Sequence, residues 1–195
     1  MAPLGGRLRR IRVPILTARL ELRLPKLTDV PLLVRYMNDP RVSRGLRTRH
    51  ASYRRSEEVA WVKHSRRAAR RGEKLNVAIT LRETGELIGG IGLEVPDWDN
   101  RHGWTGYWLM PQHWHHGYGS EAASAICGLA FVQLKLHRID AKVFEFNPRS
   151  MRLLQKLGFK KEGTTREVLY RGGRWHSEFC FGLLAREFRP LRGTP

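Results

Sequence analysis

Residues 107–122, near the middle of the chain, limit its fold more than any other segment. A strand-like run is followed by a loop that contains Gly117 and Gly119, and the loop leads directly into an apolar helical pattern. Glycines let a loop turn its N–H groups inward, and the first turn of a helix adds free N–H groups and a positive dipole end. Such donors bind a phosphate or pyrophosphate group. The segment lacks the Lys-Ser/Thr pair of a P-loop and the third glycine of a dinucleotide fingerprint, which disfavours NTP and NAD binding.

The patterns on either side of this segment alternate between strand and helix. Period-two runs predict strands at residues 16–24, 75–81, 87–95, 103–110, 138–146, 164–170 and 175–184. Helical patterns cover residues 28–37, 56–71, 119–134 and 148–157, with Ser56 and Asn147 as expected N-caps and Gly72 as a stop. This order predicts a mixed α/β (α+β) fold, a single sheet with helices on both faces. We expect one domain over residues 14–190, between a basic flexible tail at 1–13 and a short tail at 191–195.

The positive charge is concentrated in one part of the chain. The formal net charge is +18, and residues 1–72 hold 19 Arg and Lys against 5 Asp and Glu. This excess favours an anionic partner, such as nucleic acid, a polyphosphate cofactor, an acidic protein or a membrane surface. A cluster at the end of the second predicted helix is either a solvated face, which the helix dipole also favours, or a partner surface. Its members are Arg66, Arg67, Arg70 and Arg71.

The remaining composition excludes several classes of protein. Cys127 and Cys180 lie in apolar surroundings with no second ligand at a metal-binding spacing, which predicts reduced thiols and no metal site. No apolar run approaches the roughly 20 residues that span a bilayer. The basic start is not followed by the apolar region of a signal peptide. We therefore predict a cytoplasmic protein that does not bind a membrane.

Residues 114–119 read W-H-H-G-Y-G and resemble the acyl-CoA-binding motif of the GNAT N-acetyltransferase superfamily. The general motif is R/Q-x-x-G-x-G/A. Trp114 in its first position is usual in the RimJ/RimL-like branch of ribosomal-protein N-terminal acetyltransferases, whereas His115 stands where that branch usually has Gly. Residues 147–163 (NPRSMRLLQKLGFKKEG) and 16–23 (LTARLELR) also resemble this branch. The resemblance implies the GNAT fold, with a mostly antiparallel twisted sheet of about six to seven strands.

The resemblance also implies acetyl-CoA as co-substrate and a set of residues that bind it. Backbone N–H groups of residues 115–120 would hold the pyrophosphate, and an N–H among residues 108–110 would polarise the thioester carbonyl. Asn147 would bind the pantetheine amides. Lys156 would either meet a phosphate or lie on a solvated face. The full set is Trp108, Leu109, Met110, Trp114, His115, His116, Gly117, Tyr118, Gly119, Ser120, Asn147, Ser150 and Lys156.

The catalytic candidates are Ser150 and a carboxylate. In the family a Ser or Tyr of this region lies near the CoA sulfur, so Ser150 would assist the leaving thiolate; alternatively it only caps the helix. Some family members use a Glu as base where this chain has Leu169. Glu167 lies two residues earlier on the same predicted strand face and could substitute for it. The alternatives are Glu94, Asp97, His113, His116 and a water chain.

Together these features predict transfer of an acetyl group from acetyl-CoA to a primary amine by direct attack in a ternary complex. The favoured acceptor is a protein N-terminal α-amine near RNA or an acidic surface, with its pocket formed by loops at residues 41–53 and 96–102. A small amine or antibiotic acceptor and a succinyl donor stay open. A nucleic-acid-binding or CoA-sensing protein without catalysis is the other class considered. Homodimers are common in this branch.

Overall fold

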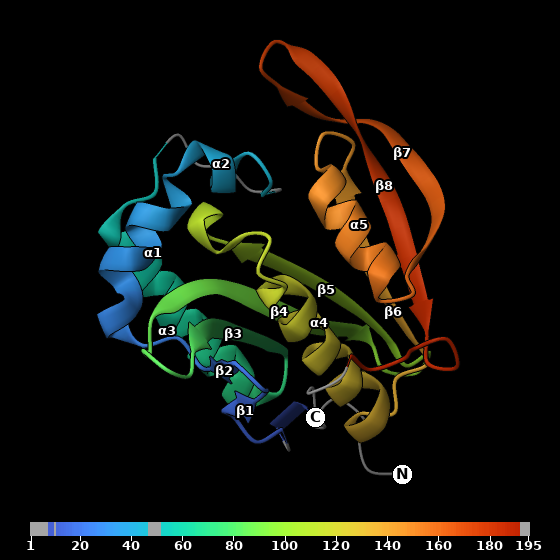
Figure 1. Ribbon diagram of the computed structural model, residues 1–195, viewed down its shortest axis with the longest axis horizontal. Helices are drawn as coiled ribbons and strands as arrows, with labels where there is room; N and C mark the ends of the chain where they lie inside the picture. The colour runs from blue at the N-terminus through green and yellow to red at the C-terminus, as the bar shows by residue number, and fades with distance from the viewer. Residues whose placement is uncertain (1–7, 10, 47–51, 192–195) are drawn as a thin grey trace.

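The computed structural model describes residues 8–9, 11–46 and 52–191. The strands within these ranges form one eight-stranded sheet (Figure 1). The strand order is β1-β2-β3-β4-β5-β6-β8-β7, and all neighbours are antiparallel except β5 and β6. The strands are β1 (Ile15–Leu16), β2 (Leu20–Arg23), β3 (Lys74–Leu81), β4 (Leu87–Asp97), β5 (His102–Leu109), β6 (Arg138–Phe144), β7 (Lys160–Arg171) and β8 (Arg174–Leu184). The predicted fold class is confirmed, with more strands than the six or seven expected.

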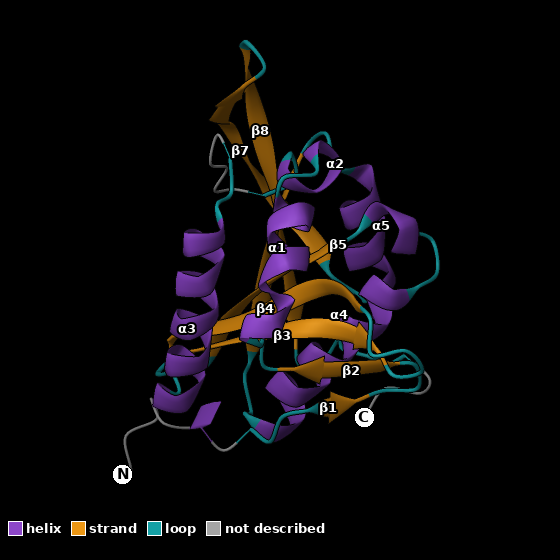
Figure 2. Ribbon diagram, turned by 90° about the vertical axis from the view of Figure 1, so that its left-hand side faces the viewer, coloured by secondary structure: helices purple, strands orange, loops and turns teal. Residues whose placement is uncertain are grey.

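Helices cover both faces of this sheet (Figure 2). They are α1 (Val30–Met37), α2 (Pro40–Ser43), α3 (Arg55–Arg71), α4 (Tyr118–Gly128) and α5 (Pro148–Lys156). One core cluster joins α1 and α3 to the sheet through Leu33, Val62 and Ala78, and a larger cluster joins α4 and α5 to the opposite face through Ile126, Leu154 and Ile91. Each face therefore has its own apolar core, and the sheet separates them. None of the helices in the described ranges is both long and apolar enough to cross a lipid bilayer.

Two local predictions need correction. The strand expected at residues 16–24 is divided into β1 and β2, because Thr17 and Leu20 form a tight turn: the Leu20 N–H donates to Thr17 Oγ1 at 3.0 Å. Helix α3 begins at Arg55 rather than after Ser56. Its first turn is closed by Glu57, whose carboxylate accepts the Arg54 N–H at 2.8 Å. The predicted stop at Gly72 is confirmed, with φ of 72° in the left-handed region.

The ends of the described chain are attached to the domain. The predicted N-terminal tail lies partly outside the described residues, but Leu8 is 4% exposed and belongs to the larger core cluster. At the other end, the Leu191 N–H donates to Ser124 Oγ at 3.0 Å. The remainder of the predicted C-terminal tail lies outside the described residues.

The centre of the sheet opens between β5 and β6. These parallel strands pair only where residues 102–104 lie beside residues 138–140, although β5 continues to Leu109 and β6 to Phe144. At the end where the two strands pair, Asp140 lies 2.9 Å from His102 Nε2 and 2.6 Å from an Arg138 guanidinium nitrogen. Beyond these charges the two strands diverge, and backbone groups in the middle of the sheet become accessible.

Two glycines on the β4–β5 side of this opening differ in how much space surrounds them. A Cβ on Gly89 would collide with the Trp108 carbonyl oxygen and lie 3.2 Å from Leu109 Cα, so β4 and β5 approach each other too closely for any side chain there. A Cβ on Gly106 would meet no atom within 4 Å. Gly89 is therefore required by packing, whereas Gly106 leaves a space.

This difference predicts opposite outcomes for two matched substitutions. Gly89→Ala should lower the free energy of unfolding by about 3 kcal/mol, because backbone atoms that cannot rotate away must shift. Gly106→Ala should change it by no more than about 0.5 kcal/mol. Urea denaturation of both variants measures the two values. Equal stability of the two variants would contradict the assigned spacing of β4 and β5.

Candidate active site

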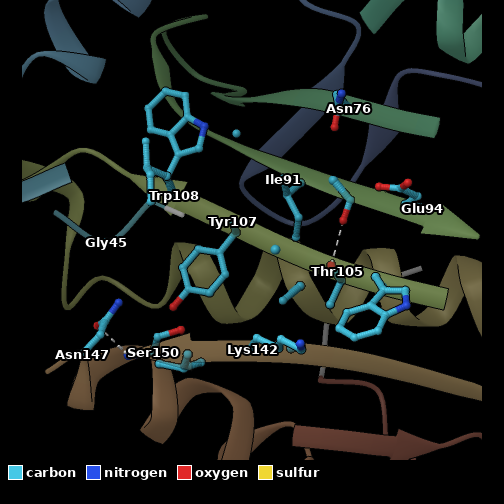
Figure 3. A pocket seen from close by; sticks show the side chains of 18 of the residues that line it. Gly45, Asn76, Ile91, Glu94, Thr105, Tyr107, Trp108, Lys142, Asn147 and Ser150 are labelled. Atoms are coloured by element: carbon cyan, nitrogen blue, oxygen red, sulfur yellow. Dashed lines mark hydrogen bonds between the residues drawn. The ribbon is translucent and has the colours of Figure 1, made fainter. Parts of the chain in front are cut away.

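Two cavities meet at the opening between β5 and β6: one lies mainly on the α1–α3 face and extends through the opening to Ala123 of α4 and Leu154 of α5, and the other lies on the α4–α5 face. The cavity on the α1–α3 face has a volume of about 700 Å³, and the one on the α4–α5 face about 800 Å³. Tyr107 and Trp108 are consecutive residues of β5 and project to opposite faces (Figure 3). The residues that line both cavities are Gly45, Leu46, Tyr107, Trp108, Asn147 and Ser150. A group bound on one face can therefore reach a group bound on the other at this junction.

Tyr107 and Ser150 lie at the junction itself. Their hydroxyl groups face each other (Figure 3); burial raises the pKa of the Tyr107 phenol, and the neighbouring Ser150 hydroxyl opposes the rise. Ser150 is held in the first turn of α5, where its N–H donates to Asn147 Oδ1 at 3.2 Å. The predicted capping by Asn147 is thus confirmed, and it leaves the Ser150 hydroxyl directed at the junction. A helix N-terminus and two hydroxyl donors are suited to a negative charge that develops there.

The cavity on the α4–α5 face has the geometry of a phosphate site. Gly117 has a φ of 80° and is the N-cap of α4, so the loop turns directly into the first helical turn. His115 has a φ of 68°, in the region that glycine prefers, and stands where Gly is usual in the related branch. Cationic side chains surround the groove: Arg41, Arg44, Arg149, Arg152 and Lys156. Free N–H groups, a helix N-terminus and these cations fit a large polyphosphate group such as that of CoA.

Most of the residues predicted to bind the cofactor line this cavity. They are Trp108, Leu109, Trp114, His115, Gly117, Tyr118, Gly119, Ser120, Asn147, Ser150 and Lys156. Met110 does not: it is 4% exposed within the α1–α3 core, and its N–H donates to the Ile88 carbonyl at 2.9 Å. Because alternate residues of an antiparallel strand face opposite neighbours, the N–H of Leu109 points toward the opening instead. His116 also lies outside the lining residues, stacked on Tyr118.

A buried hydrogen-bond network fixes the glycine loop to the N-terminal strands. Glu121, in the first turn of α4, accepts from Thr17 Oγ1 at 2.6 Å and from the Arg19 N–H and Nε at 2.8 Å each. Arg19 also donates to the His116 carbonyl at 2.9 Å and stacks on Tyr118. Burial alone would raise the pKa of Glu121, but the Thr17 and Arg19 hydrogen bonds lower it below its usual value. This network was missed in the sequence, where Thr17, Arg19 and Glu121 stood only as parts of two separate motifs.

The cavity on the α1–α3 face is a slot over β4 and β5. Its floor is formed by three directly opposed pairs, Gly90 with Trp108, Gly92 with Gly106, and Glu94 with Trp104. Gly106 opens on free space, whereas the Trp108 indole lies over Gly90 and the Asn76 side chain over Gly92. Leu33 and Met37 of α1 and Trp61 of α3 cover the slot, and Gly45, Leu46 and Tyr53 line it from the loop region predicted at 41–53. Residues 47–51 of that loop lie outside the described residues, and none of residues 96–102 lines the slot.

The predicted base candidates occupy very different positions. Glu94 lines the slot, but its side chain is about half exposed and lies 3.0 Å from Lys74 Nζ. Glu167 is exposed on β7 and lines neither cavity. A bulge between Thr165 and Leu169 breaks the alternation on which its assignment to the Leu169 face rested. Asp97 also lies outside both cavities, and His113 lines the phosphate cavity with its Nε2 3.2 Å from Glu86.

A carboxylate that the sequence analysis missed, Glu178, lines the slot. Glu178 of β8 is 3% exposed, and Lys142 Nζ lies 3.8 Å from its Oε2. It pairs directly with Phe144 of β6. Counted from the Trp104–Asp140 pair, Phe144 is four residues along β6 and Trp108 four residues along β5, and both line the slot. Glu94 pairs with Trp104, three residues or about 10 Å before Tyr107 along β5.

Comparison with known proteins identifies the class of this fold and site. A family model described as an acetyltransferase (GNAT) domain matches residues 19–160. The chain is 33% identical over 173 residues to an uncharacterized N-acetyltransferase, p20, from Bacillus licheniformis, and the match covers 88% of this chain and 96% of that protein. The protein is an N-acetyltransferase, and it belongs to the GNAT family.

Solved structures of low sequence identity share this fold. A GNAT-family acetyltransferase from Bacillus anthracis superimposes with a TM-score of 0.78 at 24% identity, covering 89% of this chain and 99% of that one. RimJ from Mycobacterium smegmatis, solved in complex with CoA-disulfide, gives a TM-score of 0.77 at 23% identity, with 86% and 83% covered. At these identities the likeness concerns the fold alone.

The network at Glu121 predicts a pH-dependent stability difference. Glu121→Gln should lower the free energy of unfolding by about 3 kcal/mol at neutral pH, because it removes a buried charge that Arg19 faces. The folded-state pKa of Glu121 is depressed, so its contribution is present above the unfolded value near ~4.3 and is lost as pH falls through the folded value. Chemical denaturation of wild type and variant from pH 7 to 3 should show the gap closing below about pH 4.3. A gap that stays constant over this range would exclude the ionised role of Glu121.

Proposed function

We propose that this enzyme transfers an acetyl group from acetyl-CoA to the α-amine at the N-terminus of a protein. The observation that carries the proposal is the meeting of two chemically different cavities at Tyr107 and Ser150. One is rich in N–H donors and cations, and the other has a glycine floor and a buried carboxylate. A polyanionic donor and an amine acceptor would thus approach the same junction from opposite faces of the sheet.

Different residues of the phosphate cavity, the one on the α4–α5 face, would bind different parts of acetyl-CoA. The N–H groups at the start of α4 would take the pyrophosphate, and Arg149, Arg152 and Lys156 would meet its other phosphate. The Leu109 N–H would polarise the thioester carbonyl from the open edge of β5. When bound, acetyl-CoA supplies the acyl group, which forms a C–N bond to the acceptor as the C–S bond breaks. Ser150, supported by Tyr107, would donate a hydrogen bond to the sulfur.

Glu178 is the group we propose to receive the proton that the acceptor ammonium loses. It is buried, pairs with Phe144, and lines the slot together with Trp108 of the junction. Lys142 beside it would stabilise the carboxylate before it takes up the proton. Glu94 would instead contact the distal part of an acceptor, near Trp104.

An α-amine fits this site better than a lysine side chain. The α-amino group has a pKa of about 7.7–8.0, against about 10.4 for Lys, so a large fraction is already neutral near pH 7.5. A single carboxylate is then sufficient for the proton. The slot also has a suitable shape, because it runs along β4 and β5 beside Gly106, where a Cβ would meet no atom within 4 Å and an extended N-terminal segment would find room.

The charge of the slot favours a second candidate acceptor, a small polycationic amine. The carboxylates of Glu57, Glu58, Glu94 and Glu178 line the slot, against the two cations Lys74 and Lys142. The local charge of the slot is therefore opposite to that of the whole chain. The two candidates differ in whether a peptide backbone must follow the amine.

An acceptor comparison tests the proposed function. We expect acetylation of a tetrapeptide with a free α-amine to exceed, at least tenfold in kcat/KM, that of the same peptide blocked at its N-terminus and carrying a Lys. Mass spectrometry identifies the modified nitrogen, and a triamine serves as the third substrate. Faster turnover of the triamine than of the free peptide would transfer the assignment to the small-amine candidate.

Replacement of Glu178 tests the proton-acceptor role. Glu178→Gln should lower kcat/KM by about 100-fold or more, because the amide cannot accept the proton. Glu167→Gln is the matched control, and we expect activity close to wild type. Thermal stabilisation by CoA should be unchanged in both variants. A Glu178 variant with full activity at all pH values would exclude this residue as the base.

A further inference from the structure

The solvent-facing side of α3 carries five cations that the proposed acetyl transfer does not use. Lys63, Arg67 and Arg70 lie about one helical turn apart and are exposed, and Arg66 and Arg71 flank them. We call these five residues the α3 basic face. Arg9 extends it, because its side chain lies against Gly72 at the end of the helix.

Little in the described part of the chain neutralises this face. Its one ion pair there joins Arg71 to Glu73 at 3.7 Å between two exposed side chains, and Arg66 donates to the Pro25 carbonyl at 3.2 Å. The helix dipole favours cations only in the last turn. Lys63 lies eight residues before the end of α3. The dipole therefore does not account for the whole basic face.

The side chains of the α3 basic face indicate which class of anionic partner it binds. A helix that binds a membrane surface presents a large apolar face beside its cations, and a specific protein interface has an apolar or aromatic centre. Between Lys63 and Arg71 every described exposed side chain is a cation or His64. Four of the five cations are arginines, which bind phosphate oxygens in bidentate fashion. Interfaces with a nucleic-acid backbone depend on this kind of contact and need no apolar centre.

Helix α3 lies along one side of the molecule (Figure 2), and its two halves differ in what they contact. Glu57, Glu58 and Trp61, in the N-terminal half of α3, line the slot, whereas the basic face occupies the C-terminal half. The helix has 17 residues and is therefore about 25 Å long. A partner on the basic face would lie beside the entrance to the slot without blocking it.

We propose that the α3 basic face binds the phosphate backbone of a nucleic acid, without reading its sequence. A second step rests on the proposed function. The α3 basic face would hold the enzyme on a protein–nucleic-acid assembly from which the N-terminus of an acceptor protein projects. The cations concentrate the enzyme on such an assembly, and the acidic slot then takes the amine. The nucleic-acid contact itself does not depend on the identity of the acceptor.

Fluorescence anisotropy of the full chain with a labelled 20-bp duplex, from 50 to 200 mM salt, tests the proposal. Saturating CoA is included so that the arginines of the phosphate cavity are occupied. The variant Lys63→Gln/Arg67→Gln/Arg70→Gln should bind at least tenfold more weakly at 50 mM salt. The slope of log K against log salt should become shallower by about 2.7, which corresponds to three phosphate contacts.

A matched control removes the same charge elsewhere. Lys135→Gln/Arg166→Gln/Arg186→Gln changes three exposed cations that lie outside α3 and both cavities. We expect wild-type affinity and slope for it. Equal losses in the two triple variants would overturn the proposal, since net charge alone would then explain binding. Equal competition by poly-glutamate or by phosphatidylserine vesicles would also overturn it, in favour of an acidic protein or a membrane.

Peptide acetylation without nucleic acid separates this proposal from the proposed function. The α3 variant should acetylate a free tetrapeptide at the wild-type rate, because none of its changed residues lines a cavity. Loss of duplex binding with full peptide acetylation supports the basic face. Duplex binding that is unaffected in the α3 variant overturns the basic face and leaves acetyl transfer standing. Absence of acetylation in the wild type refutes the proposed function alone.

Discussion

The short pairing of β5 with β6 is the constraint on which the rest of the structure depends. Three residues of each strand lie side by side, and a charged cluster around Asp140 holds them at one end. Had the parallel pairing continued, the backbone groups of β5 after Trp104 would be hydrogen-bonded to β6, and no passage would join the two faces. The GNAT site is thus an interrupted sheet, whose unpaired edge supplies donors that are already oriented.

The Glu121 network explains how widely separated motifs act as one unit. Thr17 and Arg19 belong to the N-terminal strands and Glu121 to the helix after the glycine loop, yet three hydrogen bonds join them. A loop made of two glycines and left-handed residues would otherwise have many conformations. Its N–H groups can converge on one anion because a buried carboxylate fixes the first turn of α4. The strand motif therefore fixes the glycine loop without lining the cavity that we propose for acetyl-CoA.

The sequence predicted what short-range chemistry determines. The Asn147 cap, the stop at Gly72 and the turn at Gly117 depend on residues within a few positions, and all three occur as expected. Glu178 could not be found in this way, because its importance comes from pairing with Phe144, 34 positions earlier, and that register appears only once the sheet is assembled. Strand alternation failed at Glu167 for the same reason, since a bulge is a property of two paired strands.

The net charge of the chain is best understood as three separate local charges. Cations around the glycine loop complement a polyphosphate donor, carboxylates in the slot complement an amine, and the α3 basic face is directed to solvent. Over 10 Å or more of water and salt these fields are largely screened from one another, so the slot can attract a cation on a chain of charge +18. The net charge therefore indicates which surroundings attract this enzyme, whereas the choice of acceptor depends on the few charges inside the slot.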